Sequence, residues 1–99
     1  MILEVATLDI KIGMSQEFEV AFDEAAKLIM TIPGYLNHDL QKCLEKRDRY
    51  LLLISWQKLE DHTIGFRQSR QYQTWKSLLH HFYDPFPEVE HYCSVLKDR

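Results

Sequence analysis

The stretch Tyr50–Trp56, YLLLISW, decides the fold. Six of its seven side chains are apolar, so an extended chain here is apolar on both of its faces. A strand with this pattern is typical of the middle of a sheet that is covered on both sides. We therefore predict a buried central strand over residues 50–56.

The N-terminal segment alternates between apolar and polar residues, which predicts a second strand over residues 2–12. Leu3 and Val5 make one face apolar at its start, so both sides of this strand are also expected to be covered. The other face carries Ile2, Glu4, Ala6, Leu8, Ile10 and Ile12.

A helix is predicted to follow the break at Gly13, with Ser15 as its N-cap. Its apolar residues recur at spacings of four, three, four and three, which gives one helical face. Pro33 and Gly34 are expected to end it. The residues of this face are Phe18, Phe22, Ala25, Ile29 and Ile32.

The rest of the chain predicts two more strands and a broken helix. A mostly polar strand is expected over Asn37–Glu45, and a helical pattern begins at Leu59 and restarts at Ser69, a natural N-cap. Val89–Val95 is expected to form a last strand. The apolar side of the restarted helix consists of Tyr72, Trp75, Leu78, Leu79 and Phe82.

The order strand, helix, strand, strand, helix, strand is the βαββαβ pattern of α+β ferredoxin-like folds. It predicts one domain over residues 1–99, with an antiparallel four-stranded sheet and both helices on one face. The other face of the sheet is apolar as well and needs a cover. A second copy of the chain is the expected cover, which gives a homodimer through the sheet faces.

Composition excludes several classes of protein. Fifteen acidic residues against twelve basic ones give a net charge of −3, which argues against a nucleic-acid or membrane-surface protein. Glu4 interrupts any signal-peptide apolar region, and no window approaches the roughly 20 apolar residues of a membrane span. We therefore expect a cytoplasmic protein, and its two cysteines, Cys43 and Cys93, fit a reducing compartment. A disulfide between them is not expected, because they fall on opposite edges of the predicted sheet.

The segments ISWQKLEDH (54–62), GFRQSRQYQTW (65–75) and EHY (90–92), in this order and spacing, resemble the antibiotic biosynthesis monooxygenase (ABM) domain. The resemblance covers nearly the whole chain. It implies a dimeric α+β barrel with a pocket between the sheet and helices of each subunit. Some members of that family are cofactor-free monooxygenases that oxidise electron-rich aromatic molecules with O2.

A haem-degrading branch of the family is not the expected match. That branch uses an Asn on the first strand, a Trp early in the second helical region and a His ten residues further on. The corresponding residues here are Ala6 or Thr7, Phe66 and Lys76. Haem is therefore an unexpected cofactor, and we predict that none is used.

His62 is the candidate catalytic residue, because the helical spacing turns it toward the sheet with Leu59 and Phe66. A neutral imidazole, with an ordinary pKa of about 6.5, can take a phenolic proton. The alternative is a core histidine that bonds a backbone carbonyl. The candidate substrate-binding residues are Trp56, Phe66, Tyr72 and Trp75 as an aromatic wall, Arg67 and Arg70 as anion anchors, Asn37 and His38 at the mouth, and His91.

The stretch HHFYDPFPEVEHY (80–92) invites a metal-site interpretation that its spacing does not favour. Successive helical residues point about 100° apart, so His80 and His81 cannot face one ion, and both are expected to point outward. No HExxH or CxxC motif is present. Phe82, Phe86 and Tyr92 are instead expected to close the end of the core.

The resulting functional prediction is a cofactor-independent monooxygenase acting on an aromatic or quinol-like small molecule. Two alternatives remain open on the same pocket. One is a non-catalytic dimer that binds or senses a small hydrophobic ligand, and the other is an isomerase-type enzyme.

Overall fold

The structure, a computed structural model, describes residues 1–96. These residues form four strands, two α-helices and two short helical turns. In chain order they are β1 (Ile2–Asp9), α1 (Ser15–Ile29), β2 (Tyr35–Lys42), β3 (Arg49–Trp56), the π-helical turn η1 (Asp61–Phe66), α2 (Arg70–Leu79), the 3₁₀ turn η2 (His80–Phe82) and β4 (Val89–Tyr92).

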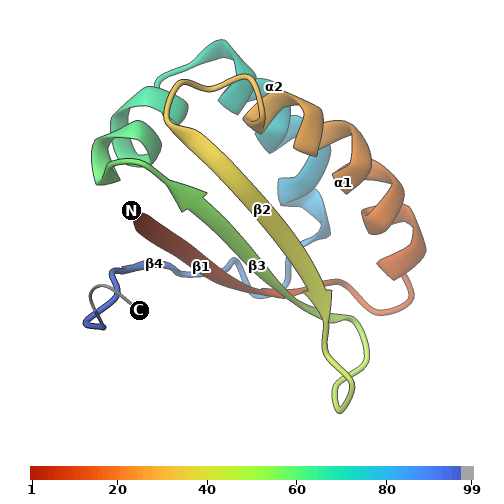
Figure 1. The fold of residues 1–99 in the computed structure, drawn as a ribbon. Helices are drawn as coiled ribbons and strands as arrows, with labels where there is room; N and C mark the ends of the chain where they lie inside the picture. Colours follow the sequence, from red (N-terminus) through yellow and green to blue (C-terminus); the bar gives the residue numbers. More distant parts are fainter. Residues whose placement is uncertain (97–99) are drawn as a thin grey trace.

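The strands form one antiparallel sheet in the order β2-β3-β1-β4, with α1 and α2 on one face (Figure 1). The predicted ferredoxin-like fold is therefore confirmed. The stretch YLLLISW lies in β3, which pairs with β2 on one side and with β1 on the other.

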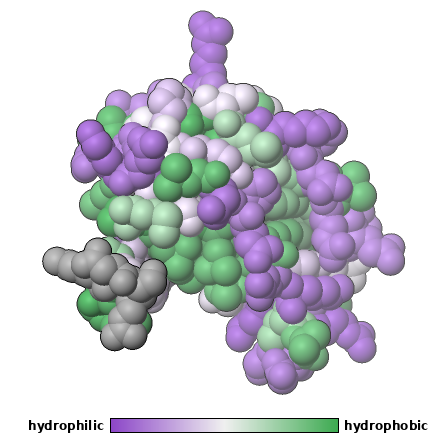
Figure 2. All heavy atoms as spheres, viewed as in Figure 1, coloured by the Kyte–Doolittle hydropathy of each residue, from purple (hydrophilic) through white to green (hydrophobic). Residues whose placement is uncertain are grey.

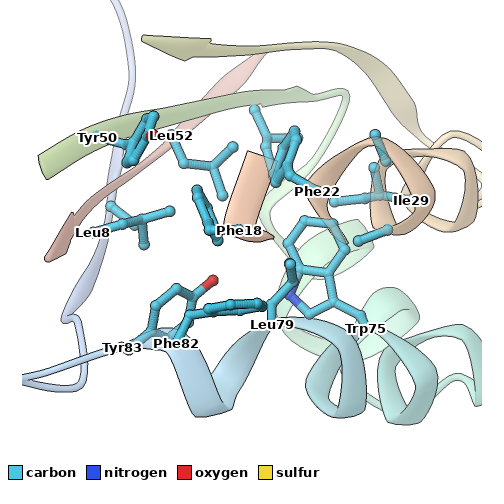
Figure 3. Packing of buried hydrophobic residues seen from close by; sticks show 14 of the residues in the cluster. Leu8, Phe18, Phe22, Ile29, Tyr50, Leu52, Trp75, Leu79, Phe82 and Tyr83 are labelled. Carbon is cyan, nitrogen blue, oxygen red and sulfur yellow. The ribbon is translucent and has the colours of Figure 1, made fainter. Parts of the chain in front are cut away.

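The core lies between the helices and the inner face of the sheet. Phe18 of α1 is completely buried at its centre, between Tyr50 and Leu52 of β3 and the α2–η2 residues Leu79 and Phe82 (Figure 3). The apolar stripe predicted for α1 and the inward residues of β1 supply most of the remaining core. Burying a side chain of this size stabilises the fold by roughly 1.5–3 kcal/mol.

The outer face of the sheet is also apolar at its centre. Leu3 and Val5 of β1 lie beside Leu51 and Leu53 of β3, and all four are only partly buried in the single chain. Figure 2 shows this hydrophobic area next to the hydrophilic side chains of β2. The expected second apolar face is therefore present.

β1 is shorter than predicted, because it ends at Asp9 rather than residue 12. Ile10 still pairs with Tyr83 as an isolated bridge, but Ile12 is 92% exposed. The chain turns away at Gly13, which has a positive φ of 79°. Glycine adopts this conformation without the steric cost that other residues incur.

Ser15 is not the N-cap of α1, contrary to the prediction. Met14 occupies that position without a side-chain capping bond, and Ser15 is the first helical residue. Its hydroxyl donates instead to Asp48 Oδ1 at 2.5 Å. Asp48 lies 33 positions further along in the β2–β3 turn, so this contact joins two loops that are distant in sequence.

Three other boundaries differ from the prediction. α1 ends at Ile29 instead of Ile32, because Thr31 and Ile32 donate to carbonyls only three residues back. β2 runs over Tyr35–Lys42 instead of Asn37–Glu45. β4 stops at Tyr92 instead of Val95, and both Cys93 and Val95 are exposed. Ser69 does cap α2 as predicted, accepting from Tyr72 N at 3.1 Å.

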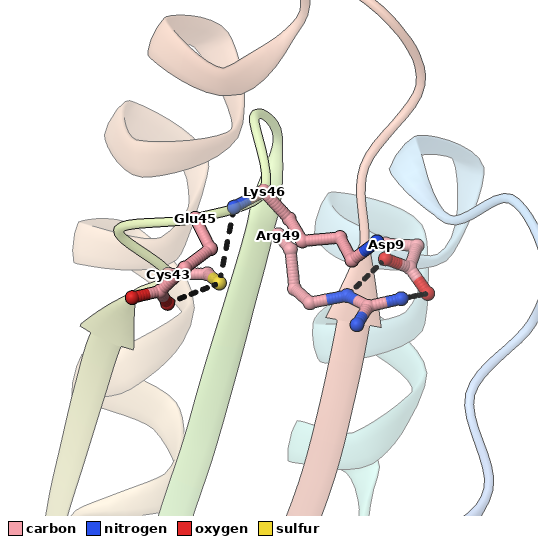
Figure 4. A network of polar contacts seen from close by, with 5 residues as sticks. All are labelled: Asp9, Cys43, Glu45, Lys46 and Arg49. Carbon is pink, nitrogen blue, oxygen red and sulfur yellow. Dashed lines mark hydrogen bonds and ion pairs between the residues drawn. The ribbon is translucent and has the colours of Figure 1, made fainter.

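The strand ends are fixed by polar contacts shown in Figure 4. Arg49 Nε of β3 donates to Asp9 Oδ1 of β1 at 2.7 Å. Cys43 is a free thiol just after β2, where its Sγ accepts from Lys46 N. Cys93 is also free and follows β4, at the opposite edge of the sheet.

Two aromatic residues expected to close the core do not. Phe86 is 62% exposed and Tyr92 is 52% exposed, whereas Phe82 is buried as predicted. Tyr83 takes the closing position: it is buried and its backbone bridges to Ile10, whereas Asp84 and Pro85 are exposed. None of the helices described here is long and apolar enough to cross a membrane.

Candidate functional site

A small cavity lies between the inner face of the sheet and the segment that connects α2 to β4. Its volume is about 80 Å³. It lies where the family resemblance places a pocket. The lining residues are Glu4, Ala6, Leu8, Leu52, His62, Phe66, Arg67, Tyr72, Trp75, His80, Tyr83, Phe86, Pro87 and Val89.

Glu4 is the most unusual residue of this cavity, because a carboxyl group only 5% exposed projects from the centre of an apolar strand face. Trp56 Nε1 donates to Glu4 Oε1 at 2.9 Å. Burial raises the pKa of Glu4 to about 7, although the Trp56 bond and the positive charge of Arg67 oppose the shift. A group with such a pKa exchanges protons readily near neutral pH.

His62 lies directly beside Glu4 and is 3% exposed. The wide turn of η1, in which Arg67 N donates to His62 O at 3.2 Å, directs both His62 and Phe66 inward. Turns of this kind occur often at functional sites. His62 Nε2 lies 3.4 Å from Glu4 Oε1. Leu59, expected on the same inward face, is exposed.

The second ring nitrogen of His62 contacts His91. The distance from His62 Nδ1 to His91 Nε2 is 2.8 Å, and which ring donates depends on their tautomers. Burial lowers the pKa of His62 to about 3, and the charges of Arg67 and His91 contribute. His62 is therefore a neutral imidazole with a protein partner at each nitrogen.

His91 reaches this position through the register of the sheet. It lies directly opposite Glu4 in the β1–β4 pairing, so both side chains are on the inner face. His91 is partly exposed and does not line the cavity. Burial, followed by the charge of Arg67, lowers the pKa of His91 as well.

Arg67 follows η1, is exposed and contributes to the lining of the cavity. Its positive charge lowers the pKa of Glu4, His62 and His91 alike. Among the salt bridges formed by residues 1–96, none involves Arg67. The guanidinium is thus available for an anionic ligand.

Three of the four predicted wall residues do line the cavity. Phe66 packs edge-on against Tyr72 and Trp75, with ring centroids 5.2 and 5.4 Å away. Trp56 is not a lining residue. It is completely buried behind the cavity, where its ring stacks on His62 and its N–H holds Glu4.

The mouth of the cavity contains His80, which the sequence analysis did not predict there. His80 was expected to point outward, but it is half-buried, lines the cavity and packs against Phe86 with ring centroids 4.9 Å apart. The reason is that α2 gives way to the tighter η2 at His80, which rotates that residue inward. His81 is exposed as expected.

Three other predicted residues lie away from the cavity. Asn37 is exposed on β2, at the edge of the sheet farthest from β4. His38 bonds Tyr35 Oη and lines a separate surface groove between α1 and β2. Arg70 is exposed at the start of α2 and is not among the lining residues.

Glu4 was not among the predicted site residues. The available signal was its position, since it is the one acid on an otherwise apolar strand face. A buried carboxyl group among apolar residues carries a large desolvation cost, so it indicates either a structural partner or a functional role. Within residues 1–96, no group of three or more His, Cys, Asp or Glu side chains could hold a metal ion.

The chain matches a known protein family and a curated relative. Residues 1–78 match the family described as antibiotic biosynthesis monooxygenase. The chain is 56% identical over 95 residues to the uncharacterized protein YczJ of Bacillus subtilis, covering 96% of this chain and 100% of that protein.

Solved structures give the same result for the fold. A putative antibiotic biosynthesis monooxygenase from Bordetella bronchiseptica is 30% identical, with a TM-score of 0.91 over 96% of this chain and 97% of that chain. SnoaB from Streptomyces nogalater, described as a cofactor-independent oxygenase, is 16% identical. Its TM-score is 0.84 over 98% of this chain and 95% of that chain. At that identity the likeness concerns the fold alone.

Proposed function

This chain belongs to the antibiotic biosynthesis monooxygenase family, and we propose that it is a cofactor-independent monooxygenase that oxidises a small aromatic or quinol-like molecule with O2. One observation carries the proposal: a carboxyl–imidazole pair, Glu4 and His62, shielded from solvent in the wall of an aromatic cavity. SnoaB, which shares the fold, is described as an oxygenase that needs no cofactor.

The chemistry begins with loss of a proton from the substrate. The Glu4–His62 pair takes a proton from an acidic O–H or C–H group, which leaves an electron-rich anion. The anion transfers electrons to O2. For a hydroquinone, one oxygen atom enters the ring and the other leaves as water: the hydroquinone and O2 give a hydroxybenzoquinone and water, so four electrons and two hydrogens are accounted for. We assign His62 a catalytic role beside Glu4, which is the acceptor of the proton, and both residues line the cavity.

The surroundings favour the anion. Arg67 places a positive charge at the cavity, and a charge-assisted hydrogen bond is worth about 1.5–3 kcal/mol. The aromatic side chains Phe66, Tyr72 and Trp75 offer flat apolar surfaces to a ring. Exclusion of water from such a site strengthens these electrostatic interactions.

The cavity also limits the size of the substrate. Its volume of about 80 Å³ is well below the roughly 300–1,000 Å³ typical of drug-sized ligands. A cavity of about 150 Å³ holds a benzene ring, so this cavity must widen even for one ring, and we assign it a molecule with no more than one ring. Outward rotation of the exposed Phe86 side chain is the means by which the ring enters.

A homodimer is the proposed assembly. The partly buried residues Leu3, Val5, Leu51 and Leu53 form an apolar area on the outer face of the sheet, and a second copy would cover it. The cavity lies on the opposite face of the sheet, so each subunit keeps its own site. Sedimentation of the purified chain tests this assembly: a dimer that dissociates in Leu53→Glu is expected, and a wild-type monomer contradicts it.

Oxygen uptake by metal-stripped protein tests the activity. Methylhydroquinone and related one-ring hydroquinones are the probes, with Glu4→Gln and His62→Ala as variants. Uptake that survives chelation and falls by about 10²-fold or more in both variants is expected of a lost proton acceptor. Unchanged uptake in both variants would rule out the proposed pair.

One alternative is favoured by the same pair. A carboxyl group with a pKa of about 7 can move a proton from one substrate position to another without O2. This isomerase activity predicts conversion that continues unchanged under anaerobic conditions. Saturable binding without any conversion would instead indicate a ligand-binding or sensing protein.

A further inference from the structure

We propose that Glu4, His62 and His91 form a proton relay that connects the cavity to solvent, with Glu4 as its inner end and His91 as its outer end. The relay rests on the proposed function, since it removes the proton that the substrate loses. The relay adds a role for His91, which does not line the cavity. It also explains how Glu4, which is shielded from water, loses the proton that it has taken from the substrate.

Two contacts join the three side chains, a close nitrogen–oxygen contact between Glu4 and His62 and a hydrogen bond between His62 and His91. Glu4 Oε1 lies 3.4 Å from His62 Nε2, and His62 Nδ1 lies 2.8 Å from His91 Nε2. No direct Glu4–His91 ion pair forms within the described chain, although the two residues face each other across β1 and β4. His62 is therefore the bridge between them.

Solvent access increases along the same path. Glu4 and His62 are buried, whereas His91 is partly exposed at the edge strand of the sheet. His62 does not exchange protons directly with water, because both of its nitrogens already have protein partners. Among the residues that the structure describes, His91 is the partner that carries the path from His62 toward solvent.

Each transfer conserves protons. Glu4 begins as a carboxylate, and both imidazoles begin with the proton on Nδ1. The substrate gives a proton to Glu4, Glu4 gives one to His62 Nε2, His62 Nδ1 gives its proton to His91 Nε2, and His91 Nδ1 releases one to water. The net change is a substrate anion, a hydrated proton and a shift of the proton of each imidazole from Nδ1 to Nε2. The reverse sequence returns a proton when the oxygen intermediate releases water.

The charges around the path favour a neutral bridge. His62 is faced by Glu4 from β1, by His91 from β4 and by Arg67 after η1, while the phenols of Tyr72 and Tyr83 lie on the cavity side. Arg67 disfavours a second positive charge on either imidazole. A proton therefore passes through His62 without residing on it.

Nuclear magnetic resonance of protein with ¹⁵N-labelled histidine tests the relay without any substrate. As Glu4 titrates, the tautomer of His62 is expected to change, and the ring nitrogens of His91 are expected to shift at the same pH. Glu4→Gln should abolish both changes while His81 remains as in wild type. A His91 that does not sense the titration of Glu4 would overturn the relay.

A kinetic experiment tests whether the proton relay operates during turnover. His91→Gln is expected to lower kcat for methylhydroquinone oxidation by about tenfold, with KM unchanged and with partial rescue by added imidazole. The exposed His81→Gln is the matched control and should retain the full rate. A full rate in His91→Gln would overturn the relay. Absence of turnover in the wild type, with the coupled titration present, would overturn the proposed oxygenase and leave the relay supported.

Discussion

Trp56 Nε1 donates a 2.9 Å hydrogen bond to Glu4 Oε1 inside the fold, where Trp56 is completely buried. This bond is the main protein contact that favours the ionised form of Glu4. It also joins β3 to β1, because Glu4 pairs with Ile54 and Trp56 lies two residues further along. A completely buried indole thus stabilises the ionised form of a buried carboxyl group.

Trp56→Phe is expected to lower the free energy of unfolding by about 2–4 kcal/mol, since it removes buried volume and leaves an acceptor without its donor. The pKa of Glu4 should rise further, because the bond that lowers it is lost. Urea unfolding and the pH dependence of oxygen uptake measure the two effects. Trp75→Phe is the control, and an equal loss in both variants would contradict a special role for the Glu4 bond.

Glu4→Gln is expected to change how stability depends on pH. Since the pKa of Glu4 rises from 4.5 in the unfolded chain to about 7 in the fold, the folded protein keeps a proton that the unfolded chain has lost. Wild-type stability therefore falls relative to the variant as pH rises from 4.5 to 7, by about 3 kcal/mol in total.

His62 does not obscure this difference. The pKa of His62 falls to about 3 in the fold, so its contribution to the free energy of unfolding decreases as pH drops below 6.5. Because both the wild type and the Glu4→Gln variant contain His62, this contribution does not distinguish them. Urea unfolding at pH 4.5, 6 and 8 gives the required values. A difference in stability that is the same at all three pH values would show that Glu4 has no raised pKa.

Arg67→Met is expected to lower kcat/KM for an anionic or ionising substrate by about 10–100-fold, which corresponds to the loss of one charge-assisted hydrogen bond. The pKa of Glu4 should rise as well, because the charge of Arg67 lowers it. Arg70→Met is the matched control, since Arg70 is exposed and outside the cavity. Equal kinetics in the two variants would remove Arg67 from the site.

Gly34→Ala is expected to reduce activity from outside the cavity. Gly34 has a φ of 91°, and a Cβ there would lie 2.0 Å from Asp61 Oδ2, at the start of η1. Asp61 would therefore have to move, and with it the turn η1, which contains His62. We expect a loss of about 1–3 kcal/mol in stability, together with a weaker His62–His91 bond detected by ¹⁵N resonance. Gly13→Ala, which has a positive φ but no close neighbour, controls for backbone strain.

Local patterns predicted the fold because its signals lie within a few residues of one another. The apolar run of β3 and the capping bond of Ser69 depend on neighbours in the sequence. Ser15 failed as a cap because Asp48, 33 positions away, bonds its hydroxyl. An apolar side chain near prolines also does not indicate whether it is buried, as Phe86 demonstrates.

The site was harder to predict than the fold. The inward position of His62 follows from helical spacing, but its partners follow from strand register. Glu4 and His91 are adjacent only because β4 pairs with β1 at that offset, and a shift of one residue would turn His91 to the other face. The sequence contains both residues without any signal that they meet.

Phe86→Ala is expected to widen the mouth of the cavity and to broaden the range of substrates. Phe86 is 62% exposed and contacts His80 and Tyr83, so its removal opens the cavity while the buried core stays intact. Stability should change by less than about 1 kcal/mol, as for most exposed positions.

Two-ring naphthohydroquinones should then be oxidised faster relative to methylhydroquinone, by about tenfold in the ratio of kcat/KM values. Phe86→Trp is the opposite change, because a larger side chain covers the same opening. It should lower the rate for two-ring hydroquinones relative to methylhydroquinone. The ratio is measured by oxygen uptake with both probes for all three proteins. If the two variants shift it in the same direction, Phe86 does not control entry, and the size limit arises from the buried walls at Phe66 and Trp75.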